Sequence, residues 1–532
     1  MITVLHNTVY KGGNMFSKVM SGTINGLEAS LVNVEVDVNN GIPSFEMSGF
    51  LGAQVKESRD RVKIAIKNSG VNLKTQRISV NISPADIRKD GTGFDLPIAI
   101  GILAANGIVS ERLLEKTFLI GELSLDGKIN SVKGILPSVC VAKDNNFERC
   151  IVPYDNMNEG SVICGIEVYG VRNLNEVIGF LNDEYELEPV KNISFDTFCM
   201  KNSNCDNVDF SEIRGQYVAK RASLIAAAGM HNIMYIGAPG SGKTLMAKRI
   251  PTILPTITFE ESLEISKIYS IAGLLDKENV LITKRPFRHP HHSVTISALV
   301  GGGKIPKPGE ITLASKGVLF LDELTEFYMS TIEALRQPLE EKLVTIVRLH
   351  AAFTYPADFM LVAAINPCKC GYYPDRNRCH CSEYDINRYL GKISQPFWDR
   401  FDISVETGKM NYSDLKLTQE DYMKENSYMT SKDMKKIVDD AIVFQRQRYK
   451  GIYKKLNSEL TIEEIKKYCQ LGSEENKLLE QAFAKLNLTT RGYHKILKTA
   501  RTIADLEQCD KINCIHLSEA ISYRSYDNAV RN

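Results

Sequence analysis

The sequence has few of the features that mark a protein for a membrane or for export. It contains no apolar run of about 18 residues or more, which is the length that a membrane-spanning helix requires. Residues 1–14 lack an apolar core of signal-peptide length. The 12 cysteines are scattered without the spacing of a small disulfide-bonded domain. We therefore expect no contact with a membrane and a reducing cytoplasm as the compartment.

An excess of charge of one sign is also missing. Lysine and arginine total 65 and aspartate and glutamate total 64, so the net charge is +1. No global field attracts nucleic acid to such a chain, and a surface for nucleic acid would have to be local. The length of 532 residues, with 43% hydrophobic and 24% charged residues, allows two or three domains with proper cores.

The chain does contain a complete phosphate-binding loop, here called the phosphate loop: Gly237, Ala238, Pro239, Gly240, Ser241, Gly242, Lys243 and Thr244. An apolar strand precedes it and a helix can begin at Thr244. Glycines let backbone N–H groups close around phosphate oxygens, Lys243 adds a positive charge, and Thr244 offers a hydroxyl to Mg²⁺. The alternative is a glycine-rich turn without a ligand. Eight matched positions between a strand and a helix favour a site for a nucleoside triphosphate.

Two later strands end in polar side chains. Residues 318–321 form an apolar strand that delivers Asp322 and Glu323. Asp322 would hold Mg²⁺ through water, and Glu323 would polarise the attacking water as general base. A third strand, residues 359–365, ends in Asn366, whose amide suits it to orient that water or to contact the γ-phosphate. Taken alone, Asn366 would more simply be a turn former before a proline.

Several further stretches are more specific than a generic ATPase motif: residues 210–216, 285–292, 298–303, 308–311, 317–324 and 491–497. Together with the phosphate loop, they make the chain resemble the YifB/ComM family of magnesium-chelatase-like AAA+ ATPases from about residue 15 to about residue 525. The resemblance implies an α/β fold with an AAA+ P-loop ATPase core and a helical lid, and it implies ATP and Mg²⁺ as ligands.

The resemblance also assigns three residues that spacing alone would not single out. Asn366 is similar to the sensor-1 residue. Arg400 is similar to the arginine finger that acts on the ATP of a neighbouring subunit, and Arg491 to the sensor-2 arginine of the lid. An arginine from outside the cradle stabilises charge on the transferred phosphoryl group. Because a finger acting in trans requires a ring, the resemblance implies a homo-hexamer.

The domain organisation follows from these motifs. Residues 1–14 are expected to be a tail or upstream sequence read through from a mistaken start. Residues 15–185 form a separate α/β domain, and the polar, aperiodic residues 186–207 form a linker. Residues 208–410 form the ATPase core, and residues 411–532 form the helical lid.

The first of these domains resembles the Lon-protease-like (ribosomal S5-like) fold. Residues 31–38 and 77–83 alternate apolar and polar side chains and predict strands, whereas residues 57–70 and 94–107 predict helices. Proteolytic members of that fold use a Ser–Lys dyad. Aligned by eye, Gly93 stands at the nucleophile position and Leu136 near the lysine position, and neither can perform the chemistry. We therefore expect a proteolytically inactive scaffold or binding module.

A second chemically distinctive segment carries two Cys-x-Cys pairs: Cys368, Cys370, Cys379 and Cys381. Four thiolates suffice for one tetrahedral Zn²⁺ in a structural site. His380 could replace one sulfur, and four reduced cysteines in an exposed loop are the alternative. The segment lies between Asn366 and Arg400, so a zinc knuckle would rigidify the stretch that presents the finger.

Residues 284–309 contain lysines, arginines and histidines and no acidic residue. In a ring, such an insertion could project into the pore and follow a phosphate backbone; a solvated basic loop is equally consistent with the residues. The resemblance favours single-stranded or branched DNA as the partner, because the ComM-like branch is implicated in branch migration and recombination during DNA uptake. The competing functions are a chelatase-like or protein-remodelling ATPase and, less well supported, an ATP-dependent protease.

Overall fold

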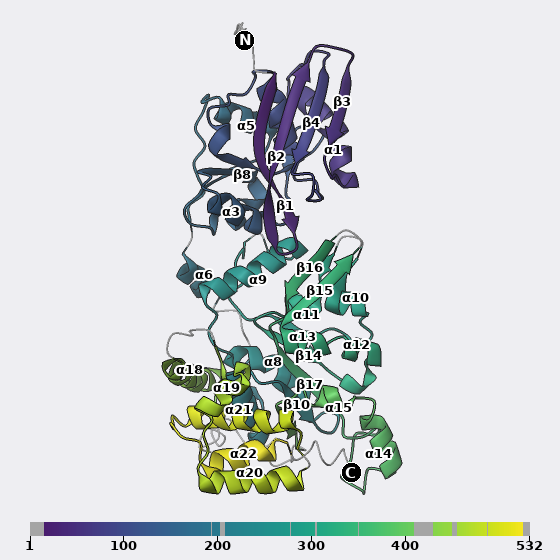
Figure 1. Cartoon of the computed structure of the whole chain (residues 1–532), viewed down its shortest axis with the longest axis vertical. Coiled ribbons are helices and arrows are strands. Elements are labelled where there is room, and N and C mark those ends of the chain that lie inside the picture. Colours follow the sequence, from purple (N-terminus) through teal and green to yellow (C-terminus); the bar gives the residue numbers. More distant parts are fainter. Residues whose placement is uncertain are drawn as a thin grey trace. The chain divides into compact units, whose positions relative to one another are not determined.

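The computed structural model describes residues 15–192, 194–202, 208–276, 278–303, 306–348, 351–408, 429–449, 455–486 and 488–524. The expectation for residues 1–14 therefore lies outside the described residues. The chain forms two compact units, which we describe separately. The first unit comprises Met1–Asn202 and Ser262–Thr283, and the second comprises Ser203–Glu261 and Lys284–Asn532. Figure 1 labels many of the helices and strands of each unit.

The first unit is built on a seven-stranded mixed sheet of order β3-β4-β2-β1-β5-β8-β9. Its strands are β1 (Phe16–Asn25), β2 (Glu28–Asn39), β3 (Ser44–Ser48), β4 (Arg77–Ser83), β5 (Thr117–Leu119), β8 (Arg149–Pro153) and β9 (Glu167–Val171). Strand β2 pairs antiparallel with β1 and β4, whereas β5, β8 and β9 run parallel to one another. A small separate hairpin joins β6 (Glu122–Leu123) to β7 (Ile129–Asn130). The two strands predicted at residues 31–38 and 77–83 are confirmed as β2 and β4.

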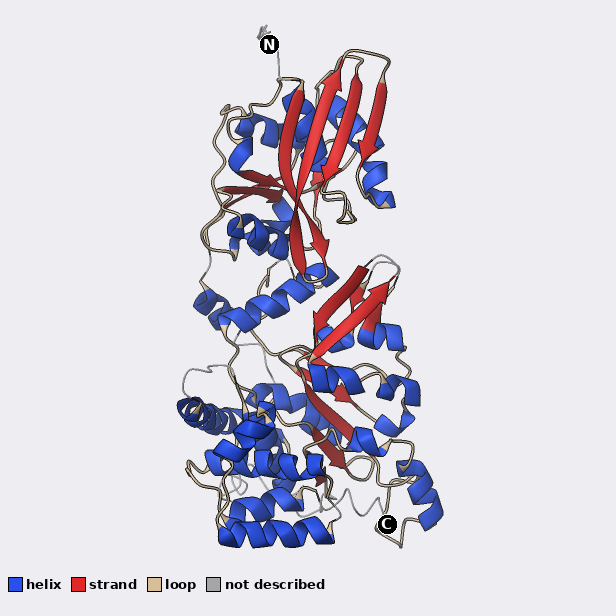
Figure 2. Ribbon diagram, viewed as in Figure 1, coloured by secondary structure: helices blue, strands red, loops and turns tan. Residues whose placement is uncertain are grey.

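Helices cover this sheet and complete its core (Figure 2). They are α1 (Ala53–Asn68), α2 (Asp95–Ala105), α3 (Ile135–Asp144), α4 (Met157–Ser161), α5 (Leu174–Leu181) and α6 (Phe195–Asn202). Every residue of helix α2 is buried, which fits a sequence that is apolar throughout after Asp95. Helix α1 begins one turn before the predicted start at residue 57, since Gly52 is extended and stops the helix there.

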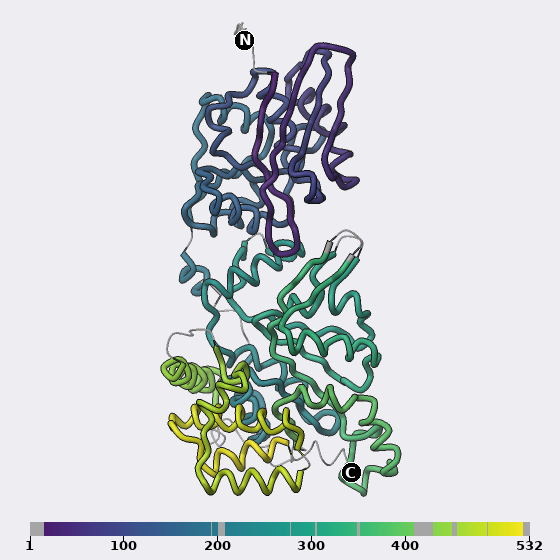
Figure 3. Tube along the Cα trace, viewed as in Figure 1, coloured from purple at the N-terminus to yellow at the C-terminus, as the bar shows by residue number. Residues whose placement is uncertain are grey.

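A segment from the middle of the chain completes the first unit. Helix α9 (Phe259–Ala272) begins in the second unit, but its greater part and the residues up to Thr283 pack in the first. Val280 and Leu281 are buried in the same cluster as Ile135 and Leu136 of α3. The backbone N–H of Gly134 donates to the carbonyl of Ser270 at 3.3 Å. Figure 3 traces this excursion of the chain. The sequence did not predict that residues 262–283 belong to the first unit.

The second unit contains a five-stranded parallel sheet of order β11-β14-β17-β10-β18. The strands are β10 (Ile233–Ile236), β11 (Phe287–Arg288), β14 (Val318–Leu321), β17 (Met360–Ile365) and β18 (Ile403–Glu406). Strands β10, β14 and β17 are fully buried, which explains their continuous apolar sequences. Two antiparallel hairpins, β12 (Gly301–Gly302) with β13 (Lys307–Pro308) and β15 (Leu343–Arg348) with β16 (Ala351–Pro356), stand apart from this sheet.

Helices of this part of the unit connect the strands. They are α7 (Tyr217–Gly229), α8 (Lys243–Ile253), α10 (Ile296–Val300), α11 (Glu310–Leu313), α12 (Met329–Glu333), α13 (Arg336–Glu341), α14 (Glu383–Leu390) and α15 (Gln395–Trp398). Helices α7 and α8 share one hydrophobic core with the sheet. The mixed architecture, with a parallel sheet and connecting helices, agrees with the α/β class expected from the motifs.

The C-terminal part of the second unit is helical. Its helices are α18 (Ser431–Arg448), α19 (Ile462–Tyr468), α20 (Ser473–Lys485), α21 (Thr490–Leu506) and α22 (Cys514–Ser522). Apolar residues of α18 and α21 lie in the same core as α7 and α8. None of the helices in the described parts of the chain has the length and apolar character to cross a membrane.

Candidate functional site

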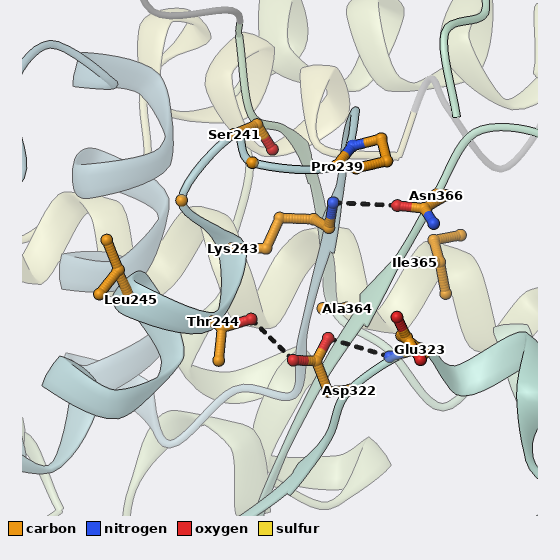
Figure 4. Close-up of a pocket in the computed structure, with 12 residues that line it drawn as sticks. Pro239, Ser241, Lys243, Thr244, Leu245, Asp322, Glu323, Ala364, Ile365 and Asn366 are labelled. Atoms are coloured by element: carbon orange, nitrogen blue, oxygen red, sulfur yellow. Dashed lines mark hydrogen bonds between the residues drawn. The ribbon is translucent and has the colours of Figure 1, made fainter. Parts of the chain in front are cut away.

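The candidate site is a pocket at the carboxyl ends of β14 and β17, next to the loop that follows β10. Its volume is about 360 Å³, which falls in the size range of small-molecule sites, roughly 300–1,000 Å³. The lining residues are Pro239 to Leu245, Asp322, Glu323, Ala364, Ile365 and Asn366. Figure 4 shows these side chains gathered around the phosphate loop. In parallel α/β sheets, ligands bind at this edge because the loops after neighbouring strands meet there.

The phosphate loop has the backbone that its glycines predict. Gly240 and Gly242 have φ angles of +77° and +89°, a region that residues with a Cβ rarely adopt. Gly242 is the N-cap of α8, so the first turn of this 11-residue helix opens directly into the pocket. The unpaired N–H groups and the dipole of that helix end favour an anion. The loop therefore offers a cradle for phosphate groups.

Lys243 is folded back across the loop. Its Nζ donates to the carbonyl oxygens of Gly237 and Ala238 at 2.7 and 2.9 Å, and to Oδ1 of Asn366 at 3.1 Å. The side chain is buried, and burial lowers the pKa of Lys243 to about 8, although Asp322 and Glu323 act in the opposite direction. The positive charge of Lys243 is thus held where an incoming phosphate group can contact it.

The acidic pair lies opposite the lysine. Asp322 accepts a hydrogen bond from Thr244 Oγ1 at 2.7 Å and one from the backbone N–H of Glu323 at 3.0 Å. These dashed contacts in Figure 4 bring a hydroxyl and a carboxylate together, a pair of hard oxygen ligands suited to Mg²⁺. Glu323 has a φ of +50° and an exposed side chain at the rim of the pocket. Sequence motifs about eighty residues apart therefore meet in one site.

Two residues that sequence reasoning missed hold the phosphate loop from behind. Gln216 Nε2 donates to the carbonyl oxygens of Ser241 at 3.3 Å and Gly408 at 2.6 Å. The hydroxyls of Ser241 and Thr407 lie 2.7 Å apart, and Thr407 follows β18. The stretch of residues 210–216 carries the family resemblance, but its sequence does not indicate that Gln216 contacts the phosphate loop.

The two arginines assigned by resemblance do not line this pocket. Arg400 is 7% exposed and its NH2 group lies 2.6 Å from Oε1 of Glu340. Arg491, at the start of α21, lies 3.1 Å from the same oxygen. Burial lowers the pKa of Arg400, with Glu340 acting in the opposite direction. Glu340 thus joins the two arginines, and nothing in its local sequence pointed to that role.

The C-terminal helices hold the segment around Arg400. Lys495 of α21 lies 3.0 Å from Asp402, and the guanidinium of Arg524 donates to the carbonyl of Phe401 at 2.7 Å. Burial by itself would raise the pKa of Asp402, but Lys495 and His231 outweigh it and hold that pKa well below its usual range. Arg400 and Arg491 are therefore presented by parts of the chain that are joined by a buried ion pair.

The four cysteines of the two Cys-x-Cys pairs converge. The Sγ atom of Cys368 lies 3.3 Å from that of Cys370 and 3.7 Å from that of Cys379, and the latter two are 3.5 Å apart. Cys381 completes the group, in which all four sulfur atoms lie within 4.8 Å of one another. His380 is exposed and is not part of the group. The cluster thus offers four sulfur ligands, and the alternative set with histidine is not the one the fold assembles.

The basic stretch of residues 284–309 uses both of its arginines within the fold. Arg285 is buried, lies 3.0 Å from Glu261, and donates to the carbonyl of Pro255 at 2.7 Å. Arg288 makes a two-pronged ion pair with Glu310 at 2.6 and 2.8 Å. Lys304 lies outside the described residues. The basic surface available to a partner is therefore smaller than the sequence predicts.

Comparisons with known protein families cover most of the chain. Residues 209–415 match the family described as magnesium chelatase, subunit ChlI. Residues 34–156 match the family described as subunit ChlI of Mg-chelatase, and residues 428–524 match the ChlI C-terminal family. The first and last of these matches together span the sheet with the candidate site and the C-terminal helices.

Several relatives match over almost their whole length. The chain is 40% identical to competence protein ComM of Haemophilus influenzae over 501 residues, which cover 94% of this chain and 96% of ComM. It is 40% identical to the YifB protein of Escherichia coli over 504 residues, with coverages of 94% and 96%. Identity to the YifB protein of Salmonella typhimurium is 38% over 502 residues, with the same coverages. With its phosphate loop, acidic pair and parallel sheet, the chain belongs to the YifB/ComM family of magnesium-chelatase-like AAA+ ATPases.

Proposed function

We propose that this protein binds and hydrolyses ATP in the pocket of the phosphate loop. The observation that carries the proposal is the convergence of Lys243, the Thr244–Asp322 pair, Glu323 and Asn366 at one edge of the sheet. Bound Mg²⁺, held by the oxygens of Thr244 and Asp322, would neutralise phosphate charge. Lys243 attracts the terminal phosphates, Glu323 takes a proton from the attacking water, and Asn366 orients that water.

Two variants separate binding from hydrolysis. Lys243→Ala removes the charge in the cradle and is expected to abolish nucleotide binding. Glu323→Gln leaves the cradle intact and removes the base, so the variant is expected to bind ATP and to hydrolyse it at least about a hundredfold more slowly. Glu326→Gln, a neighbouring exposed carboxylate, serves as the control. Equal ATP binding by the lysine variant and the unaltered protein would contradict the assignment of the phosphate loop.

The proposed assembly is a homo-hexameric ring in which Arg400 acts on the nucleotide of a neighbouring copy. Its support is that Arg400 and Arg491 lie outside the pocket of their own chain and are tied together through Glu340. Arg491, carried by α21, is proposed to act as the sensor-2 arginine of the helical lid, which can close over the nucleotide. An arginine that reaches the phosphates only in the assembly makes hydrolysis depend on neighbours.

The proposed substrate is DNA, single-stranded or branched, moved by this ring during recombination. Support comes from the relative named as a competence protein, which matches over almost its whole length, and from the exposed Lys307 in strand β13. The engagement of Arg285 and Arg288 within the fold counts against a large basic surface. The test measures ATP hydrolysis with single-stranded, branched and fully duplex DNA at two salt concentrations, since phosphate contacts weaken with salt. Severalfold stimulation by the first two supports the proposal.

A chelatase-like or protein-remodelling ATPase without a DNA substrate is the second candidate. It is favoured by the matches to magnesium-chelatase subunit families in both units of the chain. Hydrolysis that no form of DNA stimulates would select this candidate over the first.

The first unit is proposed to be a Lon-protease-like module without proteolytic activity. A Cβ at Gly93 would lie 3.0 Å from the side chain of Ile120, and Leu136 is fully buried at the start of α3. Neither position offers a nucleophile or a base. Incubation with unfolded casein and ATP should produce no fragments, and ATP-dependent cleavage that survives in a Lys243→Ala control would point to a contaminating protease.

The four clustered cysteines are proposed to hold one structural Zn²⁺. Four Zn–S bonds of about 2.3 Å in a tetrahedron place the sulfur atoms about 3.8 Å apart, and the three Sγ–Sγ distances of 3.3, 3.7 and 3.5 Å are close to that value. With four protein ligands no coordination position stays open, so the role is structural. Metal analysis of protein purified without added metal should find about one zinc per chain.

A further inference from the structure

The cysteine cluster does not lie at a distance from the nucleotide pocket. Cys368 follows Asn366 by two residues, and Asn366 accepts the hydrogen bond of Lys243 at 3.1 Å. The turn that begins at Cys368 closes with a hydrogen bond from the N–H of Gly371 to the carbonyl of Cys368 at 2.9 Å. We call residues 368–381 the knuckle. One end of the knuckle is thus continuous with a residue that touches the catalytic lysine.

The same turn packs against the phosphate loop itself. A Cβ placed on Gly371 would lie 2.4 Å from Cδ and 2.8 Å from Cγ of Pro239, so the backbone of Gly371 rests directly on the proline ring. Pro239 lines the pocket. Gly371 also has a φ of +83°, so glycine meets both the backbone and the space requirement there. The phosphate loop is therefore supported by the knuckle on the Pro239 side and by Gln216 and Thr407 on the Ser241 side.

The knuckle is held by short-range turn contacts, such as the N–H of Cys379 donating to the carbonyl of Asp375 at 2.8 Å and Arg376 donating to the carbonyl of Cys381 at 2.9 Å. Residues 367–382 form no helix or strand, and Cys368 and Cys379 are its buried cysteines. Tyr372 and Arg378 stack at 4.1 Å, a contact that contributes little at an exposed position. Four cysteines this close together are a typical ligand set for a structural metal ion. A metal ion would supply the free energy that holds such a segment in one conformation.

We infer that the knuckle is a metal-dependent support of the phosphate loop, so that nucleotide affinity depends on the ion held by the four cysteines. The metal fixes the turn at Cys368 and Cys370, the turn holds Gly371 against Pro239, and Pro239 keeps the loop in its binding conformation. The inference rests on the nucleotide site and the zinc site proposed above. It extends them by giving the metal a role in binding the nucleotide.

The first experiment removes the metal. Cys379→Ser/Cys381→Ser protein should contain no zinc and bind the fluorescent nucleotide mant-ADP at least tenfold more weakly than the unaltered protein. Unaltered protein stripped with a chelator should lose affinity to the same extent and recover it when Zn²⁺ alone is returned. Far-ultraviolet circular dichroism checks that the rest of the fold persists. Unchanged affinity after complete loss of zinc would overturn the inference.

The second experiment keeps all four cysteines and disturbs the contact. Gly371→Ala should retain its zinc but bind mant-ADP more weakly, because its Cβ pushes against Pro239. Adding Pro239→Ala removes the clashing ring atoms and should restore part of the affinity, with Pro239→Ala alone as reference. Gly70→Ala is the matched control, since Gly70 has a similar φ of +86° with no atom within 4 Å of the added Cβ. No recovery in the double variant would mean that backbone strain, not the contact, causes the loss.

These results are distinguishable from failure of the proposed function. If mant-ADP binds Lys243→Ala as well as the unaltered protein, the nucleotide site itself is misassigned. If binding depends on Lys243 but is the same with and without zinc, the nucleotide site stands and the support by the knuckle fails. If purified protein contains no zinc, support of the phosphate loop by a metal ion is ruled out. Intact mass under denaturing conditions then shows whether disulfides join the cysteines instead.

Discussion

At the scale of single residues, Lys243 decides how the pocket responds to pH. Its ammonium group lies among three oxygen acceptors, yet it is buried where water no longer solvates it. Burial lowers its pKa to about 8, and the carboxylates of Asp322 and Glu323 reduce the effect without cancelling it. A bound phosphate brings further negative charge into contact with the ammonium and raises that pKa again.

We therefore expect nucleotide affinity to fall as pH rises through 8. Below that pH Lys243 is already protonated and affinity stays constant. Above it, binding must take up a proton, and affinity should fall by about tenfold per pH unit until the pKa of the complex is reached. Calorimetric titration with ADP at pH 8.5 in two buffers of different ionisation enthalpy should detect the uptake. An affinity that is constant from pH 7 to pH 9 would contradict the role given to burial.

At the scale of elements, three helices meet at one carboxylate. Glu340 belongs to α13, Arg491 to α21, and Arg400 follows α15. Both arginines contact the same oxygen of Glu340, and the Lys495–Asp402 ion pair links α21 to the segment of Arg400 a second time. A movement of α21 would therefore be transmitted through Glu340 and the Lys495–Asp402 pair to the segment that carries Arg400.

Replacing the shared carboxylate tests this coupling. Glu340→Ala should leave nucleotide affinity unchanged, because Glu340 lies outside the pocket, and should lower kcat by about tenfold as both arginines lose their common partner. Steady-state hydrolysis together with mant-ADP binding separates the two effects. Glu341→Ala, which removes the same charge one residue away, is the control. An equal loss in the two variants would mean that the charge of α13, and not its contact with the arginines, matters.

At the scale of the whole molecule, the two units are not consecutive in sequence. The chain leaves the second unit within α9, contributes Ser262–Thr283 to the first, and returns. Glu159, which is buried and has a raised pKa because of that burial, accepts hydrogen bonds from the Ser270 hydroxyl at 2.5 Å and from the N–H of Leu136 at 3.0 Å. The first unit therefore depends on a segment encoded within the ATPase region.

A fragment of residues 15–202 should accordingly be less stable than the same fragment fused to residues 262–283. Burial of Val280 and Leu281 contributes about 3–6 kcal/mol in total, a large part of the stability of a typical domain, about 5–15 kcal/mol. Thermal unfolding and binding of a hydrophobic dye compare the two fragments. Identical unfolding midpoints would show that the segment is an attachment and not part of the core.

The assembly is tested by mixing two inactive variants. Arg400→Ala should bind ATP normally but lose most hydrolysis, because the finger stabilises charge that develops in the transition state. Mixed with Glu323→Gln protein, some interfaces would combine an intact Glu323 with an intact Arg400 from the neighbour and recover activity. Each variant mixed with unaltered protein sets the reference. Absence of recovery would indicate that Arg400 acts within its own chain, and wild-type hydrolysis by Arg400→Ala would limit Arg400 to its structural ion pair with Glu340.

The convergence of residues in the candidate nucleotide site was largely predictable from sequence because these residues lie in short contiguous motifs. A phosphate loop needs particular glycines, one lysine and one hydroxyl in order, and an acidic pair or an asparagine at the end of an apolar strand marks the same edge of a parallel sheet. The four cysteines could be grouped for the same reason, since two Cys-x-Cys pairs lie close along the chain. Strands and helices with clear periodicity, such as residues 77–83, were likewise predictable.

Contacts between distant segments were decided only by the tertiary structure. Nothing next to Glu340 in the sequence indicates two arginines 60 and 151 positions later as its partners. The approach of Gly371 to Pro239 and the transfer of Val280 and Leu281 to the first unit depend in the same way on how the elements pack. A local motif shows which chemistry its residues can perform. Pairings between distant residues instead depend on shape and burial across the fold, and a single sequence has no local pattern that indicates them.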